Sequence, residues 1–183
     1  MKAIILCGGL GTRLSSIVND RPKPMAEIND YPFLEFLIRY LKNQGINQFI
    51  LAISYMPEKI ISHFEDGSKL GVNIEYAIEK DALGTAGAIK NCQELLPPKE
   101  NFFVLNGDTF LNINFSKLVK FYENKQADGV LVLRRFQDIS SKGEVKINDN
   151  QKILSFEEKK PEHRPGLING GIYLFNPKIL SNI

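Results

Sequence analysis

An apolar run near the N-terminus ends abruptly in a cluster of glycines, and this feature most constrains the fold. Residues 3–7 carry no alternating polar side chains, so they are typical of a strand covered on both faces, as in a parallel α/β sheet. Gly8, Gly9 and Gly11 follow within four positions and let the backbone turn sharply and approach a bulky group. We therefore expect a ligand-binding turn at the carboxyl end of the first strand, where open α/β sheets bind their ligands.

A hydroxyl and a cation come directly after these glycines. The guanidinium of Arg13, which follows Thr12, is planar and permanently charged, and this suits phosphate oxygens. The run lacks the Gly-Lys-Ser/Thr ending of a Walker A loop, and Leu14 stands where G-x-G-x-x-G requires its third glycine. The pattern favours a phosphate-binding loop of another kind over a tight turn with a surface arginine.

The composition argues against several functional classes. The chain of 183 residues fits one domain, and its net charge of +2, spread along the sequence, gives no footprint for nucleic acid or an anionic membrane. No apolar run approaches the roughly 20 residues of a membrane span, and Met1-Lys2 leads straight into the first strand, so neither a membrane segment nor a signal peptide is expected. Cys7 and Cys92 are expected to be reduced core thiols of a cytoplasmic protein.

Strand-like and helix-like segments alternate along most of the chain. Strands are expected over 48–53, 72–78, 101–105 and 129–135, and helices over 31–43, 57–64, 85–95 and 115–124. This alternation predicts an α/β fold, a Rossmann-like and mostly parallel sheet flanked by helices. Short strand-like pieces at 143–147, 152–156 and 171–175 predict a smaller mixed-sheet lobe, laid over the carboxyl edge of the first sheet.

Two charged residues are candidates for phosphate chemistry. Lys23 stands between Pro22 and Pro24, which stiffen the backbone and disfavour a helix, so its charge is better positioned than that of a lysine on a mobile surface. Asp108 comes soon after the expected strand 101–105 and beside a glycine. This placement suits Mg²⁺, which binds one or two carboxylates plus substrate phosphates. We favour the metal over an ordinary turn residue because neighbouring strand ends carry phosphate-like loops.

Glu79 opens a second glycine-bearing turn after the expected strand 72–78. A carboxylate only accepts hydrogen bonds, and guanine presents adjacent N1–H and N2–H₂ donors that a carboxylate can bridge. Uracil or thymine, with a single N3–H between two carbonyls, would be better matched by an amide side chain. A solvated glutamate in a charged turn remains an open alternative for this residue.

Several motifs together resemble the sugar-1-phosphate nucleotidyltransferases, which make NDP-sugars from an NTP and a sugar phosphate. The motifs span essentially the whole chain and occur in the family's order: Gly8-Gly9-Leu10-Gly11-Thr12-Arg13, Lys23-Pro24-Met25, Leu83-Gly84-Thr85-Ala86, Asn106-Gly107-Asp108, Gly143, Glu158-Lys159 and Asn169-Gly170-Gly171. Within the family, the stretches Lys-Pro-Met-Ala, Pro-Phe-Leu-Glu and Phe-Glu-Asp-Gly-Ser and the Glu79 loop are most similar to guanylyltransferases of D-glycero-α-D-manno-heptose 1-phosphate.

The resemblance implies a division of labour among the site residues. Arg13 would offset charge on the leaving pyrophosphate, Lys23 would sit over the reacting phosphates, and Asp108 would bind a bridging Mg²⁺. The nucleotide would be bound by Leu6, Gly8, Gly9, Gly11, Thr12, Glu79, Gly84, Thr85 and Asn106. The sugar 1-phosphate would be bound by Gly143, Glu158, Lys159 and Asn169. One domain would then hold a nucleotide-binding part, about residues 1–135, and a sugar-binding part, 136–183.

Alternatives remain within the resemblance. Similar sequences serve mannose, glucose or N-acetylmuramate 1-phosphates with GTP, CTP, dTTP or UTP, and a non-catalytic nucleotide-sugar sensor could use the same fold. A role in surface-polysaccharide synthesis is implied, and a homo-oligomer is compatible with the sequence. Family members supply a second metal carboxylate from an Asp-Ile-Gly-like segment near the C-terminus. The sequence ends at Ile183 without that segment, so either it is part of a longer enzyme, which we favour, or metal binding is weaker and rests on Asp108.

Overall fold

The computed structural model describes residues 1–9, 21–81 and 83–183, so Gly11, Thr12 and Arg13 lie outside the described residues. The chain forms two compact units: the first unit is Met1–Val130 with Tyr173–Ile183, and the second unit is Leu131–Ile172. These bounds differ from the expected division at residue 135, because the last strand of the chain runs back into the large sheet and carries the C-terminal residues into the first unit.

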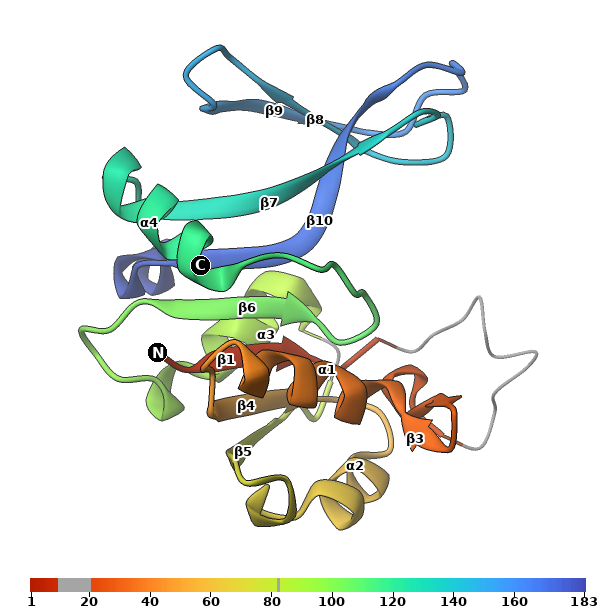
Figure 1. The fold of residues 1–183 in the computed structure, drawn as a ribbon, viewed down its shortest axis with the longest axis vertical. Coiled ribbons are helices and arrows are strands. Elements are labelled where there is room, and N and C mark those ends of the chain that lie inside the picture. The colour runs from red at the N-terminus through yellow and green to blue at the C-terminus, as the bar shows by residue number, and fades with distance from the viewer. Residues whose placement is uncertain (10–20, 82) are drawn as a thin grey trace. The chain divides into compact units, whose positions relative to one another are not determined.

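A six-stranded, mostly parallel sheet is the main element of the fold (Figure 1). Its strands lie in the order β5 (Asn73–Ile78), β4 (Gln48–Ile53), β1 (Ala3–Leu6), β6 (Phe102–Asn106), β10 (Gly166–Phe175) and β7 (Gly129–Phe136). Strand β1 pairs in parallel with both β4 and β6, so that Ile4 is level with Ile50 and Val104, and β4 pairs in parallel with β5. The predicted α/β fold class is confirmed.

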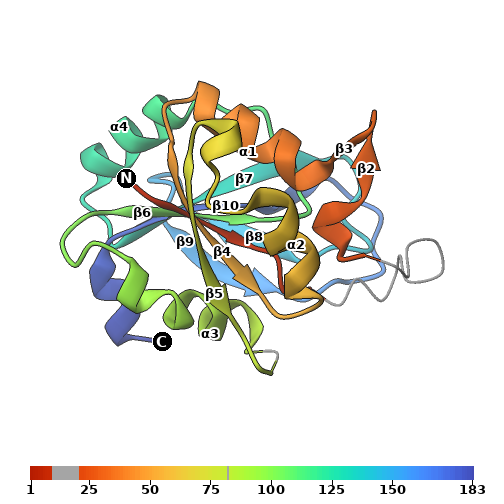
Figure 2. The same ribbon diagram turned by 90° about the horizontal axis from the view of Figure 1, so that it is seen from below.

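Helices cover both faces of the sheet in the first unit. Figure 2 shows α1 (Phe33–Asn43), α2 (Pro57–Phe64) and α4 (Phe115–Lys125) on one face and α3 (Gly84–Asn91) on the other. The α1 side chains Leu34, Leu37, Ile38 and Leu41 are buried, as their helical spacing predicts. Two antiparallel pairs complete the fold: β2 (Glu27–Ile28) with β3 (Tyr31–Pro32), and β8 (Glu144–Ile147) with β9 (Ile153–Glu157).

The core explains why the first strand has no polar alternation. Ala3, Ile4 and Ile5 are completely buried, because consecutive side chains of a strand point to opposite faces and both faces are covered here. Toward α3, Ile4 packs in a cluster with Ala88 and Ile89, and on the other face the ring of Phe103 meets Phe115 of α4 at 5.2 Å. Along the described part of the chain, no helix is long and apolar enough to cross a membrane.

Cys7 and Cys92 are free and fully buried, as predicted. Burial raises the pKa of the Cys7 thiol far above its usual range, and the negative charge of Asp108 adds to this shift. Burial also raises the pKa of Cys92 to about 12, with a further contribution from Glu79. Both thiols are therefore packing groups and not nucleophiles.

Two local expectations need correction. Lys23–Met25 forms one turn of 3₁₀-helix where the flanking prolines predicted none, since proline is tolerated in the first turn of a helix. Strand β10 begins at Gly166, five residues before the expected strand, and includes Asn169-Gly170-Gly171. Pairing within a sheet overrides the turn preference of an Asn-Gly-Gly sequence.

Candidate active site

Four parallel strands of the first unit bring polar groups to one edge of the sheet. Gly8 follows β1, Ser54 follows β4, Glu79 follows β5, and Asp108 lies two residues beyond β6. Because β1, β4, β5 and β6 are parallel, their carboxyl ends share this edge. The chain order reverses at β1, which has β4 on one side and β6 on the other, and such a switch point is where open α/β sheets bind ligands.

Lys23 and Asp108 form an ion pair at this edge, although 85 positions separate them in the sequence. The backbone around Lys23 is fixed: Pro22, Pro24 and Met25 are buried, and the Met25 N–H donates to the Pro22 carbonyl at 2.8 Å. Both charged side chains stay about one-third exposed, at 34% and 37%, so they remain open to a ligand. The structure thus holds a cation and a carboxylate side by side.

The segment that carries Asp108 is tied to the glycine turn. The Gly107 N–H donates to the Leu6 carbonyl at 2.9 Å, which continues the β1–β6 ladder past the end of Leu6. A Cβ on Gly107 would lie 2.7 Å from that carbonyl oxygen, so only glycine fits this close approach. Asn106 is the last residue of β6, and its carbonyl accepts from the Thr109 N–H at 3.4 Å. These contacts set the direction in which the Asp108 side chain leaves the sheet.

Gly8 lies against two polar side chains from the neighbouring strand ends. The Ser54 hydroxyl donates to the Gly8 carbonyl at 2.5 Å. A Cβ on Gly8 would lie 2.8 Å from Ser54 Oγ and 3.5 Å from Glu79 Oε1, so both groups face the turn. Ser54 was not among the predicted site residues, because a lone serine after a strand carries no motif.

Glu79 is 6% exposed, which is unusual for a carboxylate, and the described residues give it a hydrogen bond at one of its two oxygens. Its Oε2 accepts a hydrogen bond from the Leu83 N–H at 3.2 Å, while Oε1 accepts none from a described residue. Leu83 precedes α3, and Gly84 begins that helix with a positive φ of 69°, a conformation that favours glycine. Thr85, in the first turn of α3, is exposed. A second acceptor oxygen of Glu79 is therefore available beside Gly8.

All four residues predicted to bind the sugar lie in the second unit. An open cavity of about 370 Å³ is lined by Lys142, Gly143, Glu144, Val145, Phe156, Glu157, Glu158, Ile168 and Asn169. Gly143, Glu158 and Asn169 thus come together, whereas Lys159 is exposed and does not line this cavity. The Asn169 Oδ1 accepts from the Gly171 N–H at 2.7 Å, which orients its amide.

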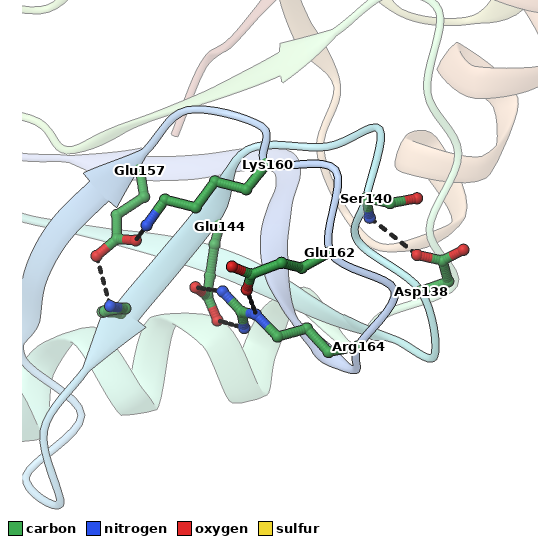
Figure 3. A network of polar contacts seen from close by, with 8 residues as sticks. Asp138, Ser140, Glu144, Glu157, Lys160, Glu162 and Arg164 are labelled. Carbon is green, nitrogen blue, oxygen red and sulfur yellow. Dashed lines mark hydrogen bonds and ion pairs between the residues drawn. The ribbon is translucent and has the colours of Figure 1, made fainter.

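Ion pairs fix two of the cavity's three carboxylates (Figure 3). Arg164 donates two parallel hydrogen bonds to Glu144, at 2.8 and 2.7 Å, and a third to Glu162. Hydrogen bonds from Lys146 and Lys160 lower the pKa of Glu157 to about 2. Within the described residues, the third carboxylate, Glu158, has no hydrogen bond or ion pair. Glu158 is the acceptor that remains for a ligand.

The protein groups at the sheet edge could hold a metal ion if a bound substrate supplied further ligands. In the described ranges, no three His, Cys, Asp or Glu side chains are grouped to hold an ion. Asp108 supplies one carboxylate, whose Oδ1 accepts from the Thr109 hydroxyl at 3.2 Å. Mg²⁺ is commonly held by one or two carboxylates plus substrate phosphates, so this set fits Mg²⁺ that arrives with a nucleotide.

Comparison with known proteins identifies the class of enzyme. The nucleotidyl transferase family model matches residues 2–183, so the chain belongs to this family. It is 51% identical over 182 residues to D-glycero-alpha-D-manno-heptose 1-phosphate guanylyltransferase of Campylobacter jejuni, covering all of this chain and 79% of the relative. It is 41% identical over 180 residues to the enzyme of that name from Aneurinibacillus thermoaerophilus, covering 98% and 76%.

A solved structure agrees with this assignment. The crystal structure of HddC from Yersinia pseudotuberculosis, complexed with GMP-PN, is similar to this chain with a TM-score of 0.87 at 34% identity. The match covers all of this chain and 79% of that one. The protein is accordingly a nucleotidyltransferase, as its motifs predicted.

Proposed function

We propose that this protein transfers a guanylyl group from GTP to D-glycero-α-D-manno-heptose 1-phosphate, releasing pyrophosphate and forming a GDP-sugar. The observation that carries the proposal is the Lys23–Asp108 pair beside the glycine turn of β1. A pure nucleotide sensor would not need a fixed cation and a metal-binding carboxylate at the same point. The two heptose 1-phosphate guanylyltransferases, with 51% and 41% identity, support the choice of substrates.

The residues present suit a single in-line displacement. An oxygen of the sugar phosphate attacks the α-phosphorus of GTP, and the bond to the β-phosphate oxygen breaks. No protein nucleophile is needed, so positioning and charge neutralisation supply most of the rate. Lys23 would leave Asp108 and donate to the reacting phosphates, and Arg13 would stabilise the leaving pyrophosphate. Mg²⁺, held by Asp108 and the phosphates, would neutralise charge on the transferring group.

Glu79 and Glu158 divide substrate recognition. Oε1 of Glu79 faces Gly8 and accepts no hydrogen bond from a described residue, and the carboxylate would accept from the N1–H and N2–H₂ groups of guanine. The nucleotide contacts of Leu6, Gly9, Gly11, Thr12, Gly84, Thr85 and Asn106 belong to the same proposal. In the second unit, Glu158 would accept from sugar hydroxyls, with Gly143 and Asn169 beside it and Lys159 on the sugar phosphate.

The wider setting follows from the substrates. We place the reaction in the cytoplasm, where nucleoside triphosphates are available and thiols such as Cys7 and Cys92 stay reduced. A GDP-activated heptose is a donor for glycosyl transfer, so the product would serve the synthesis of a surface polysaccharide. The proposed reaction needs the two small substrates and Mg²⁺.

Replacing Glu79 by glutamine tests the guanine assignment. The amide keeps the side chain's shape and its acceptor for the Leu83 N–H, but it turns one acceptor into a donor that opposes guanine N2–H₂. Hydrogen bonds to charged groups contribute about 1.5–3 kcal/mol, so the ratio of kcat/KM for GTP to that for UTP is expected to fall about ten- to hundredfold. Initial rates of pyrophosphate release with each nucleotide measure this ratio.

Asp81→Asn is the matched control for this variant. Asp81 is an exposed carboxylate two residues further along the same turn, and the substitution makes the same change of charge. Its GTP-to-UTP ratio is expected to equal that of the unmodified protein. An unchanged ratio in Glu79→Gln, or an equal fall in both variants, would contradict the role given to Glu79.

A further inference from the structure

A phenylalanine ring stands exposed on the wall of the cavity in the second unit. Phe156, near the end of β9, is 64% exposed and is among the residues that line the cavity with Gly143, Glu158 and Asn169. Its partner across the β8–β9 pair is Val145, which is 3% exposed. Both residues line the cavity, where Val145 is buried and the Phe156 ring is exposed.

Phe156 stands two positions before Glu158, the cavity carboxylate for which the described residues supply no partner. Phe156 lies near the end of β9 and Glu158 directly follows that strand, and both residues line the cavity. Glu157, between them in the sequence, is paired with Lys146 and with Lys160, and Figure 3 shows the Lys160 contact. Among the described residues, Glu158 has no ionic or hydrogen-bond partner. The cavity wall therefore combines the apolar ring of Phe156 with a hydrogen-bond acceptor, Glu158.

This combination matches the two-sided chemistry of a sugar ring. Sugar hydroxyls need acceptors and donors, which Glu158 and the Asn169 amide provide. The C–H groups of the ring form apolar patches whose hydrogens carry a partial positive charge, and the face of an aromatic ring is negative. Small-molecule sites likewise combine an apolar wall with a few polar groups, in cavities of about 300–1,000 Å³.

We propose that Phe156 is a sugar-positioning residue whose ring packs against the C–H face of the sugar while Glu158 binds its hydroxyls. The inference rests on the proposed function, because the sugar is the acceptor substrate of that reaction. It adds a residue that sets sugar affinity and orientation and that takes no part in nucleotide binding. Substitutions of Phe156 should therefore change the KM for the sugar 1-phosphate and leave the KM for GTP unchanged.

Steady-state kinetics of two matched variants test the proposal. Phe156→Ala is expected to raise the KM for heptose 1-phosphate about tenfold, while the KM for GTP stays within twofold. Leu154→Ala removes an apolar side chain from the same strand with the same 64% exposure, but Leu154 does not line the cavity. Both KM values of Leu154→Ala are expected to stay within twofold of the unmodified protein.

Two further variants separate the ring from simple apolar volume. Phe156→Leu keeps an apolar side chain but loses the ring, so its KM for the sugar 1-phosphate should rise as in Phe156→Ala. Phe156→Tyr keeps the ring, so its KM for the sugar 1-phosphate should stay within threefold of the value for the unmodified protein. An unchanged sugar KM in both Phe156→Ala and Phe156→Leu, or an equal rise in Leu154→Ala, would overturn the inference.

The same kinetics distinguish this inference from the proposed function. Activity of the unmodified protein with heptose 1-phosphate and with mannose 1-phosphate is measured alongside the variants. Use of mannose 1-phosphate alone would overturn the proposed heptose specificity, and Phe156 would then be judged by the KM for mannose 1-phosphate. A normal rate with heptose 1-phosphate and no effect of the Phe156 variants would overturn the inference alone.

Discussion

Replacing Asp108 by asparagine is expected to lower kcat about a thousandfold, or about 4 kcal/mol of transition-state stabilisation. The amide has the same shape as the carboxylate but no negative charge, so it would bind Mg²⁺ poorly and leave the charge of the transferring phosphoryl group unbalanced. The loss should appear in pyrophosphate release at saturating GTP and sugar 1-phosphate. Within the described residues, no three His, Cys, Asp or Glu side chains are grouped to hold an ion, so no described cluster would replace Asp108.

The Asp108→Asn variant should nevertheless fold normally. Its ion pair with Lys23 is about one-third exposed, and exposed pairs contribute at most about 1 kcal/mol to stability. The melting temperature is expected to change by only a few degrees. Asp128→Asn, at an exposed aspartate just before β7, serves as the control and should keep full activity. Turnover by Asp108→Asn like that of the unmodified protein would contradict the metal role of Asp108.

Replacing Lys23 by methionine is expected to lower kcat/KM for GTP about a hundredfold or more, which corresponds to about 2.7 kcal/mol or more. Methionine fills a similar volume without the charge, and the buried Pro22, Pro24 and Met25 should hold the backbone unchanged. Lys120→Met, at an exposed lysine of α4, is the control and should retain full activity. A loss of less than fivefold in Lys23→Met would contradict its place over the phosphates.

The double variant shows whether the two residues act together. If Lys23 and Asp108 stabilise the same reacting phosphates, removing both should cost little more than removing Asp108 alone. Full additivity of the two losses would mean that they act at separate steps. The ion pair between them makes the cooperative result the expected one.

Much of the nucleotide-binding fold could be predicted from the sequence because its signals are local. The bounds of β4 and α2 agree with the expected segments, since an apolar strand and a proline-started amphipathic helix are each specified by a few adjacent residues. The place of β10 between β6 and β7 could not be predicted. It depends on pairing between strands that are distant in sequence, and its Asn-Gly-Gly segment favours a turn when considered alone.

For the candidate site, too, the sequence indicates the individual residues but not the contacts between them. Gly8, Lys23 and Asp108 could be predicted as site residues from glycine and proline chemistry and from their places after strands, and Glu79 from its hydrogen-bonding chemistry, and their roles stay predictions. Only the structure shows that Lys23 meets Asp108 and that Glu79 and Ser54 face Gly8, because these contacts join loops 46 to 85 positions apart. The exposure of Phe156, and the lack of a partner for Glu158 among the described residues, likewise depend on which neighbours are already paired.

Direct detection of the product tests the central claim. The protein is incubated with Mg²⁺, GTP and D-glycero-α-D-manno-heptose 1-phosphate, and the mixture is followed by ³¹P NMR and mass spectrometry. The account predicts GDP-heptose and pyrophosphate in equal amounts, with little product when UTP replaces GTP or when Mg²⁺ is chelated. Binding of GTP without any product from heptose or mannose 1-phosphate would contradict the account and would identify the protein as a nucleotide-binding sensor.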